Sequence, residues 1–346
     1  MTTLTFSNTL EQHPHKKITI GVSSCLLGFK VRYNGDHKRD HYISDILGNY
    51  VEYLALCPEA ESGLGIPREP IHLVVNTMGK RQAIGTKNKQ LNVTEPLLRF
   101  SKNTAKHLIP ISGYIFKSSS PSCGIRDIPT FDSAGCIVES GPGLFAEEIM
   151  HTWPRLPVID EVQLQNSKMR DNFIERVYAY QRWRELCTPG VTPPKLEKFH
   201  QQQRSVLLSH GANGLKTLDL VIEKLHKERP SLARILNEYE RDFMQILKRQ
   251  TTRQQHCRVL VHLLNKIKNN ISIEECNRTF ELIMDYRTGY SPWSAPVEAM
   301  KNLLSHTPYA ELTKQIYLNP DPVEMILRGL NSTSRKPVGL SEQRIY

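Results

Sequence analysis

The strongest constraint on the fold of this chain is a pattern that occurs three times: a short apolar run, typical of a buried β-strand, with a cysteine shortly after it. The cysteines are Cys25, Cys57 and Cys123, and the preceding runs cover residues 18–22, 51–56 and 111–116. Helical segments alternate with these strands, which predicts a parallel α/β sheet with right-handed crossovers. Because ligands bind beyond the carboxyl ends of the strands in such a sheet, we expect the three thiols to meet at one edge.

The remaining cysteines give no sign of a disulfide framework. The chain has seven cysteines, an odd number, and none belongs to a C-x-x-C motif. This spacing argues against a zinc ribbon and a thioredoxin-type site, and favours free thiols or ligands in a reducing compartment. We expect Cys136 to be a free thiol. Three thiols at one edge, with no obvious fourth, indicate a metal or iron–sulfur centre with one open coordination position.

A proline-rich segment, residues 188–194, divides the chain, since prolines interrupt helices. Before it, strand and helix signals alternate, and residues 71–75 and 82–84 are expected to form a β-hairpin. After it, apolar residues at helical spacing predict helices almost throughout. We therefore expect an α/β domain with a mainly parallel sheet, a linker, an all-α helical bundle and a tail, at residues 1–187, 188–194, 195–328 and 329–346.

Positive charge is concentrated in the second half of the chain. Residues 1–150 carry 16 Lys and Arg against 14 Asp and Glu, whereas residues 151–346 carry 29 against 21. An ordinary solvated helix surface and a surface for a polyanionic partner both account for this excess. The polar start of the chain, residues 1–17, is unlike a signal peptide, and no apolar run approaches the ~20 residues that cross a bilayer. We expect a cytoplasmic protein with no membrane partner.

Small and polar residues surround each of the three cysteines. The segments are Ser-Ser-Cys-Leu-Leu-Gly at 23–28, Cys-Pro-Glu at 57–59 and Ser-Pro-Ser-Cys-Gly at 120–124. A single cysteine is more often a small buried apolar residue than a ligand. Around all three cysteines, however, glycines, prolines and hydroxyl groups let the backbone approach a bulky inorganic group and offer hydrogen-bond donors to it.

These three segments resemble the thiouracil desulfidase family, in the same order, over roughly residues 16–183. The resemblance implies that Cys25, Cys57 and Cys123 are the ligands of a [4Fe–4S] cluster, and that the fourth iron is open for the sulfur of the substrate. A thiocarbonyl is a soft ligand that suits such an iron. Binding there would let water add to the ring carbon without net redox change, so the activity implied is non-redox desulfuration.

Water addition needs an acid or base beside the cluster. Glu59, two residues after a ligand, is the leading candidate, and Asp36 is the next. The alternative for Glu59 is a structural role, as a helix N-cap or in a salt bridge to Arg68. Further side chains could bond the ring or orient water, and these are Lys117, Ser120 and Ser122.

The second half resembles a helical domain that is often fused behind this desulfidase unit. Matching segments lie at 198–200, 256–262 and 285–289. Fused proteins of this kind are associated with removal of sulfur from 4-thiouridine in tRNA, so the resemblance implies tRNA as the partner. Basic residues fit a phosphate-contacting face, and they are Lys195, Lys198, Arg204, Arg241, Lys248, Arg249, Arg253, Arg258, Lys266 and Lys268.

Two further features of the second half have simpler explanations. The histidines at positions 200, 210, 256 and 262 could suggest a second metal site, but we expect them to be satisfied or solvent-facing. Arg182 and Arg184 could extend the basic face beside Trp183, which we expect to pack. We also expect the basic helices and the cysteine edge to form one continuous positive surface.

Three functions remain open. The leading one is an iron–sulfur desulfidase that converts thiolated uridine in tRNA to uridine. A second keeps the chemistry but takes free thiouracil or small thiolated nucleotides as substrate, with the helical domain as a lid or oligomerisation element. A third is a non-enzymatic, cluster-carrying nucleic-acid binder or redox sensor, which needs no open iron.

Overall fold

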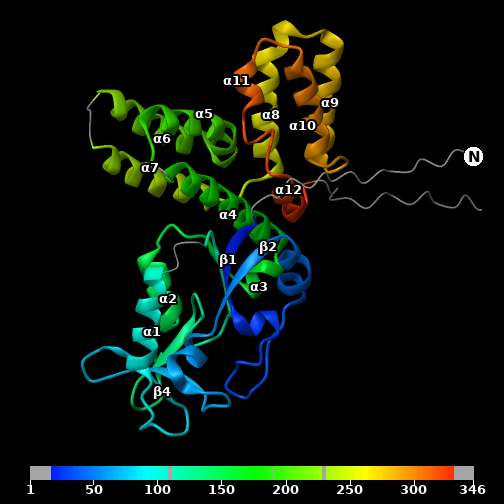
Figure 1. Cartoon of the computed structure of the whole chain (residues 1–346). Helices are drawn as coiled ribbons and strands as arrows, with labels where there is room; N and C mark the ends of the chain where they lie inside the picture. The colour runs from blue at the N-terminus through cyan, green and yellow to red at the C-terminus, as the bar shows by residue number, and fades with distance from the viewer. Residues whose placement is uncertain (1–16, 108–110, 189, 228–230, 331–346) are drawn as a thin grey trace, which may run out of the picture.

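A computed structural model describes residues 17–107, 111–188, 190–227 and 231–330 of the 346-residue chain. Figure 1 shows an α/β region with helices arranged above it. Both parts of the predicted fold class, a mainly parallel sheet followed by a helical region, are confirmed. Within the described parts of the chain, no helix combines the length and the apolar character needed to cross a membrane.

The central sheet is four-stranded and entirely parallel, in the order β2-β1-β5-β8. Its strands are β1 (Ile18–Ser23), β2 (Val51–Leu56), β5 (Tyr114–Phe116) and β8 (Val158–Asp160). Gly21 is required in β1 because a Cβ there would lie 2.3 Å from the ring of Tyr114. The predicted strand at 111–116 is regular only from Tyr114, although the amide of Ser112 still donates to the carbonyl of Thr19 at 2.8 Å.

A second four-stranded sheet, in the order β4-β3-β6-β7, was only partly predicted. Its strands are β3 (Ile71–Val75), β4 (Arg81–Gly85), β6 (Ile128–Phe131) and β7 (Ile137–Gly141). β3 and β4 form the expected hairpin, whereas β6 pairs with β3 in parallel and with β7 antiparallel. The sequence did not predict β7, because its residues are mostly exposed and do not alternate between buried and exposed.

Twelve α-helices lie within the described residues. Those in or beside the α/β region are α1 (Thr94–His107), α2 (Leu144–Thr152), α3 (Glu161–Gln165) and α4 (Ser167–Cys187). The rest are α5 (Pro193–His210), α6 (Ala212–Lys227), α7 (Leu232–Leu247), α8 (Arg253–Ile267), α9 (Ile273–Thr288), α10 (Ser294–Ser305), α11 (Ala310–Thr313) and α12 (Pro322–Arg328). A π-helix (Tyr42–Ile46) and a 3₁₀-helix (Leu47–Asn49) lie before β2.

Helix α4 joins the two regions through one shared core. Near its end, Trp183 stacks on Tyr239 of α7 with ring centroids 5.3 Å apart and meets Phe199 of α5 edge-on at 5.6 Å. The same apolar cluster continues into the α/β region through Tyr114 and Phe116. Deleting the chain after the linker would therefore expose apolar core, so a truncated protein is a poor test of what the helices do.

The helical region packs at the amino edge of the parallel sheet. Arg155, which precedes β8, forms an ion pair with Glu240 of α7, and Ile111, which precedes β5, belongs to the core shared with α5 and α7. In Figure 1, α5 to α11 lie above the strands. The cysteines follow the carboxyl ends of the strands, at the other edge. Most of the helical region and the cysteines therefore lie at opposite edges of the sheet, and the continuous positive surface stays a prediction.

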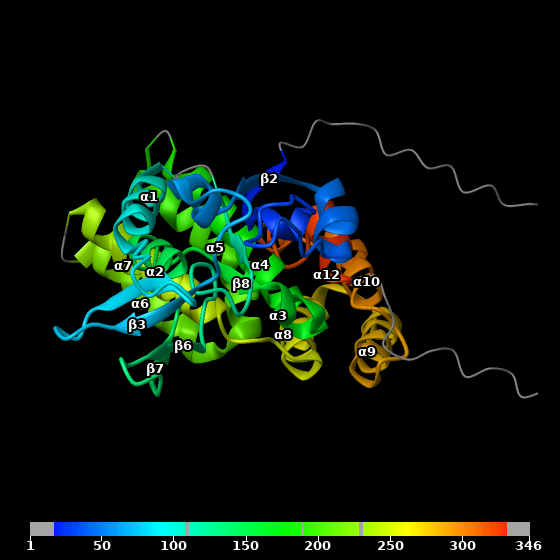
Figure 2. The ribbon, with the colours of Figure 1, turned by 90° about the horizontal axis from the view of Figure 1, so that it is seen from below.

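The last helix, α12, returns to the α/β region and lies beside α4 (Figures 1 and 2). Arg328 of α12 bonds Asp171 of α4 at 2.6 Å and lies 3.1 Å from Glu175 of the same helix. The end of the helical region is thus tied by ion pairs to the helix that follows the parallel sheet.

Two arginines that were expected to extend the basic face are used inside the fold instead. Arg182 pairs with Glu324 of α12 at 2.9 Å. Arg184 donates to the carbonyl of Ile111 at 2.9 Å. Trp183 between them is buried, as expected.

Acidification should weaken the fold through His256, whose ring nitrogens lie 3.1 Å from the hydroxyls of Tyr317 and Thr251. Burial lowers the pKa of His256 from 6.5 to about 3. Between these values the unfolded chain binds a proton that the folded chain does not, so stability present above pH 6.5 is lost as the pH falls. From pH 7 to pH 5 we expect the free energy of unfolding to drop by about 2 kcal/mol from this group. In urea denaturation, the free energy of unfolding should depend less steeply on pH for His256→Gln than for the unaltered protein. An unchanged pH dependence would contradict the assignment.

Candidate active site

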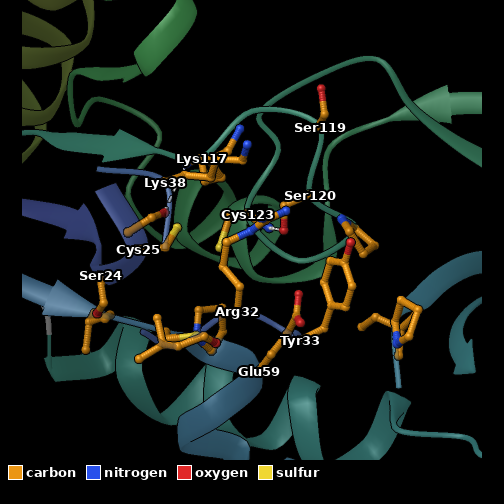
Figure 3. A pocket seen from close by; sticks show the side chains of 18 of the residues that line it. Ser24, Cys25, Arg32, Tyr33, Lys38, Glu59, Lys117, Ser119, Ser120 and Cys123 are labelled. Atoms are coloured by element: carbon orange, nitrogen blue, oxygen red, sulfur yellow. Dashed lines mark hydrogen bonds between the residues drawn. The ribbon is translucent and has the colours of Figure 1, made fainter. Parts of the chain in front are cut away.

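The three predicted cysteines line one cavity at the carboxyl edge of the parallel sheet. Cys25 lies in a 3₁₀ turn (Ser24–Leu27) directly after β1, Cys57 follows β2, and Cys123 lies in the loop after β5. Figure 3 shows Cys25 and Cys123 at the cavity with Lys117 and Glu59. The cavity volume of ≈ 320 Å³ lies at the lower end of the roughly 300–1,000 Å³ typical of small-molecule sites.

Backbone hydrogen bonds fix the loop that carries Cys123. The hydroxyl of Ser120 accepts from the amide of Cys123 at 3.0 Å and from that of Ser122 at 3.3 Å. The carbonyl of Ser122 accepts from an amide in the first turn of α2 at 3.0 Å. Gly143 is needed at this junction because a Cβ there would lie 2.6 Å from the carbonyl oxygen of Pro121. The loop is thus anchored to a helix.

The second cysteine is held at both its amide and its thiol. The amide of Cys57 donates to the Glu61 carboxylate at 2.7 Å, and its thiol lies 3.6 Å from the carbonyl oxygen of Val31. Glu61 belongs to a short π-helix (Ala60–Leu64) that begins just after the Cys-Pro-Glu segment. These contacts fix the position of Cys57 on the cavity wall.

The donor set suits a soft metal centre. All three cysteines are free of disulfides. Burial raises the pKa of Cys25 to about 11, with a further contribution from Cys57, and burial also raises the pKa of Cys57 and of Cys123. The thiolate forms therefore need a cation to compensate them, and metal binding would release their protons.

Among the described residues, no group of three or more His, Cys, Asp or Glu side chains is arranged to hold a single metal ion. In an iron–sulfur cluster the cysteines bind different irons, so the thiolates stand farther apart than ligands of one ion. That the three thiols on this cavity wall hold such a cluster stays a prediction.

Glu59 lies against the cavity and is held by two partners. Arg68 donates to its Oε2 at 2.7 and 3.0 Å, and the hydroxyl of Ser122 donates to its Oε1 at 2.8 Å. Glu59 also occupies the N-cap position of the π-helix but makes no capping hydrogen bond. The salt bridge considered as an alternative role is therefore present, and it gives the carboxylate a defined orientation beside the cysteines.

Glu161 is a charged residue of this region that the sequence reasoning missed. Its carboxylate bonds Lys117 Nζ at 2.6 Å and the amide of Ser118 at 2.7 Å. Burial opposes ionisation, but these hydrogen bonds outweigh it and lower the pKa of Glu161. Glu161 directly follows β8. Ligands bind beyond the carboxyl ends of parallel strands, and the same argument applied to β8 would have pointed to Glu161.

The other predicted residues divide between the cavity and its surroundings. Lys117 and Ser120 line the cavity, whereas Ser122 is fully buried behind Glu59. Asp36, the second acid–base candidate, does not line it. The carboxylate of Asp36 is exposed and accepts from the next amide along the chain at 2.7 Å.

Two further residues line the cavity without having been assigned a role from the sequence. These are Arg32 and Tyr33, and the guanidinium lies 5.3 Å from the centroid of the ring. Figure 3 shows both of them beside Glu59 and Cys123. Their position in the loop after Cys25 is the only sequence signal that could have pointed to them.

In the helical region, three of the four predicted histidines have structural partners. His200 lies 2.9 Å from a carboxylate oxygen of Asp219. His210 Nδ1 lies 2.6 Å from the carbonyl oxygen of Arg249. His256 lies between two hydroxyls. His210 Nε2 lies 3.2 Å from Glu175 but makes no hydrogen bond among the described residues. His262 is exposed to solvent.

Part of the predicted basic face is paired within the protein. Arg204 pairs with Asp219, and Arg241 pairs with Asp242. Arg253 donates to a backbone carbonyl at 2.8 Å. These guanidinium groups are therefore less available to a partner than the sequence suggested.

Comparison with known proteins gives two family matches. Residues 20–161 match the model of a family described as 2-thiouracil desulfurase. Residues 205–322 match a family described as a protein of unknown function (DUF1722). The first match falls on the α/β region and the second on the helical region.

Two curated relatives are similar to parts of the chain. The uncharacterized protein YbbK of Bacillus subtilis (strain 168) is 35% identical over 109 residues, which cover 30% of this chain and 71% of that protein. The uncharacterized protein YbgA of Escherichia coli (strain K12) is 25% identical over 158 residues, which cover 46% of this chain and 93% of that protein. Among solved structures, a [4Fe-4S]-dependent thiouracil desulfidase, TudS, is 30% identical, with a TM-score of 0.34, over 43% of this chain and 94% of that one.

Proposed function

This chain belongs to the 2-thiouracil desulfurase family, and we propose that it removes sulfur from a thiolated uracil base with a [4Fe–4S] cluster held by Cys25, Cys57 and Cys123. The observation that carries this proposal is the meeting of three thiols and one oriented carboxylate, Glu59, in a single cavity. A cluster with a purely structural or sensing role would need the ligands but no such carboxylate.

The cofactor is proposed from the donor set. Cys25, Cys57 and Cys123 would bind three irons, and no fourth cysteine lines the cavity among the residues described. A cluster bound in this way would supply a soft Lewis acid that binds the sulfur of a thiocarbonyl and draws electron density from its carbon. Side chains of this protein would transfer the protons and hold the thiolated nucleobase in place.

The reaction balances without electron transfer. Water adds to the thiocarbonyl carbon, the C=S bond breaks, a C=O bond forms, and sulfur leaves as sulfide with the two protons of the water. Glu59 is placed to accept a proton from the attacking water and to return it toward the departing sulfur. Arg68 and Ser122 are positioning residues, because their hydrogen bonds fix the carboxylate.

Two other cavity residues remain for the substrate ring. Lys117 lies on the cavity wall and is paired with Glu161, so its ammonium has a fixed place. Tyr33 is 39% exposed, and the guanidinium of Arg32 lies beside its ring. Aromatic rings and guanidinium groups are common stacking partners for an unpaired base. We assign Lys117 to hydrogen bonding of the ring and Tyr33 to stacking.

For the substrate, we propose 4-thiouridine in tRNA. The basic second half, with 29 Lys and Arg against 21 Asp and Glu, supports a polyanionic substrate. Enzymes that act on a base within folded RNA turn it out into a pocket, and the cavity beside Tyr33 is a candidate for that pocket. Free thiouracil is the second candidate. One observation favours it: the helices pack at the edge of the sheet opposite to the cavity, so they do not wall it.

The two substrates can be separated by one anaerobic experiment. Iron-loaded protein is incubated with thiolated tRNA or with 2-thiouracil at equal thiocarbonyl concentration, and the nucleosides or bases are quantified. We expect 4-thiouridine in tRNA to be converted to uridine with the higher kcat/KM. A higher value for free 2-thiouracil would assign the small base as substrate, and no conversion of either by iron-loaded protein would reject the desulfidase proposal.

A further inference from the structure

The helical region has a cavity of its own, of ≈ 460 Å³, which none of the three cysteines lines. It forms where the turn between α5 and α6 meets the first turns of α8, and we call it the cationic cavity. In Figure 1 it lies where two groups of helices meet, α5 to α7 on one side and α8 to α11 on the other. The lining residues that matter for its chemistry are His210, Gly211, Arg249, Gln255, Arg258 and His262.

The charge of the cationic cavity is uncompensated. None of the residues that line it is an aspartate or a glutamate. Among the described residues, the ion pairs include neither Arg249 nor Arg258, whereas Arg204 and Arg241 of the same region are each paired with an aspartate. Two guanidinium groups without a carboxylate partner, on one cavity, form a site with a strong preference for an anion.

A buried histidine fixes the backbone of one of the two arginines. His210 is 2% exposed, and its Nδ1 lies 2.6 Å from the carbonyl oxygen of Arg249. Its other ring nitrogen, Nε2, lies 3.2 Å from Glu175, a carboxylate that is also close to Arg328. The backbone of Arg249 is thus tied to the end of α5 from within the core.

The turn between the helices is shaped to fit the same arginine. Gly211 has a φ of +136°, and a Cβ there would lie 3.3 Å from Arg249 Nη1. A larger residue would strain the backbone at this positive φ, and the guanidinium would have to move by a few tenths of an ångström to make room for its Cβ. The absence of a side chain lets the arginine lie over the turn, beside the start of α6.

The start of α6 contributes donors to the same cavity. Ala212 and Asn213, the first two residues of the helix, line the cavity with the two arginines. The first amides of a helix have no acceptor within the helix, and they carry the positive end of its dipole. An anion in the cavity would therefore meet backbone donors as well as the guanidinium groups.

From these observations we infer that the cationic cavity binds a phosphate group, with Arg249 and Arg258 as its main ligands and the first amides of α6 completing the site. Planar guanidinium groups match phosphate oxygens in pairs, which makes phosphate the anion that best suits this donor set. The phosphate belongs either to an RNA backbone or to a free nucleotide. Its binding does not depend on the desulfuration chemistry, so the inference stands or falls separately from the proposed function.

The test uses binding of the full-length, iron-loaded protein rather than turnover. The affinities for inorganic phosphate, for uridine monophosphate and for a bulk tRNA are measured by calorimetry or fluorescence anisotropy at several salt concentrations. The variants are Arg258→Gln and the double variant Arg249→Gln with Arg258→Gln. The control is Arg278→Gln, an exposed arginine of α9 that does not line the cavity. Circular dichroism checks that every variant is folded.

We expect Arg258→Gln to weaken phosphate binding roughly tenfold or more, as for loss of a charge-assisted hydrogen bond, and Arg278→Gln to leave it unchanged. If the natural ligand is RNA, we expect the affinity for tRNA to fall together with the affinity for phosphate. The slope of the logarithm of the tRNA binding constant against the logarithm of the salt concentration should then become shallower by about one unit for each lost phosphate contact. If it is a free nucleotide, uridine monophosphate binding falls and tRNA binding does not. If Arg258→Gln and Arg278→Gln have equal affinities for inorganic phosphate, uridine monophosphate and tRNA, the inference is overturned.

Discussion

Replacing Glu59 by glutamine should slow desulfuration strongly while leaving the iron content of the protein unchanged. Glutamine keeps the shape of the side chain, and its amide can accept from Arg68 and donate to the hydroxyl of Ser122, the two partners of the carboxylate. It cannot accept and return the proton that water addition requires. We expect kcat to fall roughly 10²–10⁴-fold, the range for loss of a general acid–base group. The measurement is kcat at saturating thiolated substrate, together with iron and sulfide per chain.

A matched control is available for this variant. Asp36→Asn makes the same chemical change at an acidic residue that does not line the cavity, and it should leave kcat near the value of the unaltered protein. Thermal unfolding shows whether loss of the Glu59 charge beside Arg68 has disturbed the fold. Near-normal turnover in a folded Glu59→Gln protein would contradict the assignment of proton transfer to Glu59.

Replacing Cys123 by serine should remove most of the bound iron and abolish activity. Cys123 is buried in the loop after β5, which is anchored through the hydroxyl of Ser120. A serine hydroxyl is a harder ligand than a thiolate and suits iron–sulfur clusters poorly. Iron and acid-labile sulfide per chain, after anaerobic reconstitution, report the loss directly.

The chain offers a control for this change as well. Cys136 is an exposed free thiol between β6 and β7 and does not line the cavity. Cys136→Ser should therefore keep both the iron content and the activity. A Cys123→Ser protein that retained a full complement of iron and sulfide would show that this thiol is not a ligand, and equal iron loss in both variants would point to a general effect of thiol removal.

The meeting of the three cysteines could be predicted from the sequence because it depends on a topological rule. In a parallel sheet the carboxyl ends of the strands share one edge, so cysteines after β1, β2 and β5 are brought together whatever the details of the loops. The antiparallel hairpin of β3 and β4 could also be predicted from the sequence, since a turn-like segment separates its two strands. The roles of the site residues remain predictions.

Other features depended on contacts that no local pattern reveals. Arg182 and Arg184 looked like surface charges, yet they pair with Glu324 and with the carbonyl of Ile111, groups more than 70 positions away in the chain. The packing of the helices at the amino edge of the sheet follows from a shared core, which only the tertiary structure shows. Asp36 illustrates the reverse case, because closeness in sequence to the first cysteine did not bring it into the cavity.

The central claim is that the cavity of Cys25, Cys57 and Cys123 carries out non-redox desulfuration. The most direct test is to incubate iron-loaded protein anaerobically, without any reductant or oxidant, with tRNA that contains 4-thiouridine and, separately, with 2-thiouracil, and to quantify the desulfurated product and sulfide over time. The account predicts that, with at least one of the two substrates, one uridine or uracil and one sulfide form for each thiocarbonyl consumed, over many turnovers, and that metal-free protein forms neither. Failure of fully iron-loaded protein to desulfurate either substrate, or a strict need for an added reductant, would contradict it.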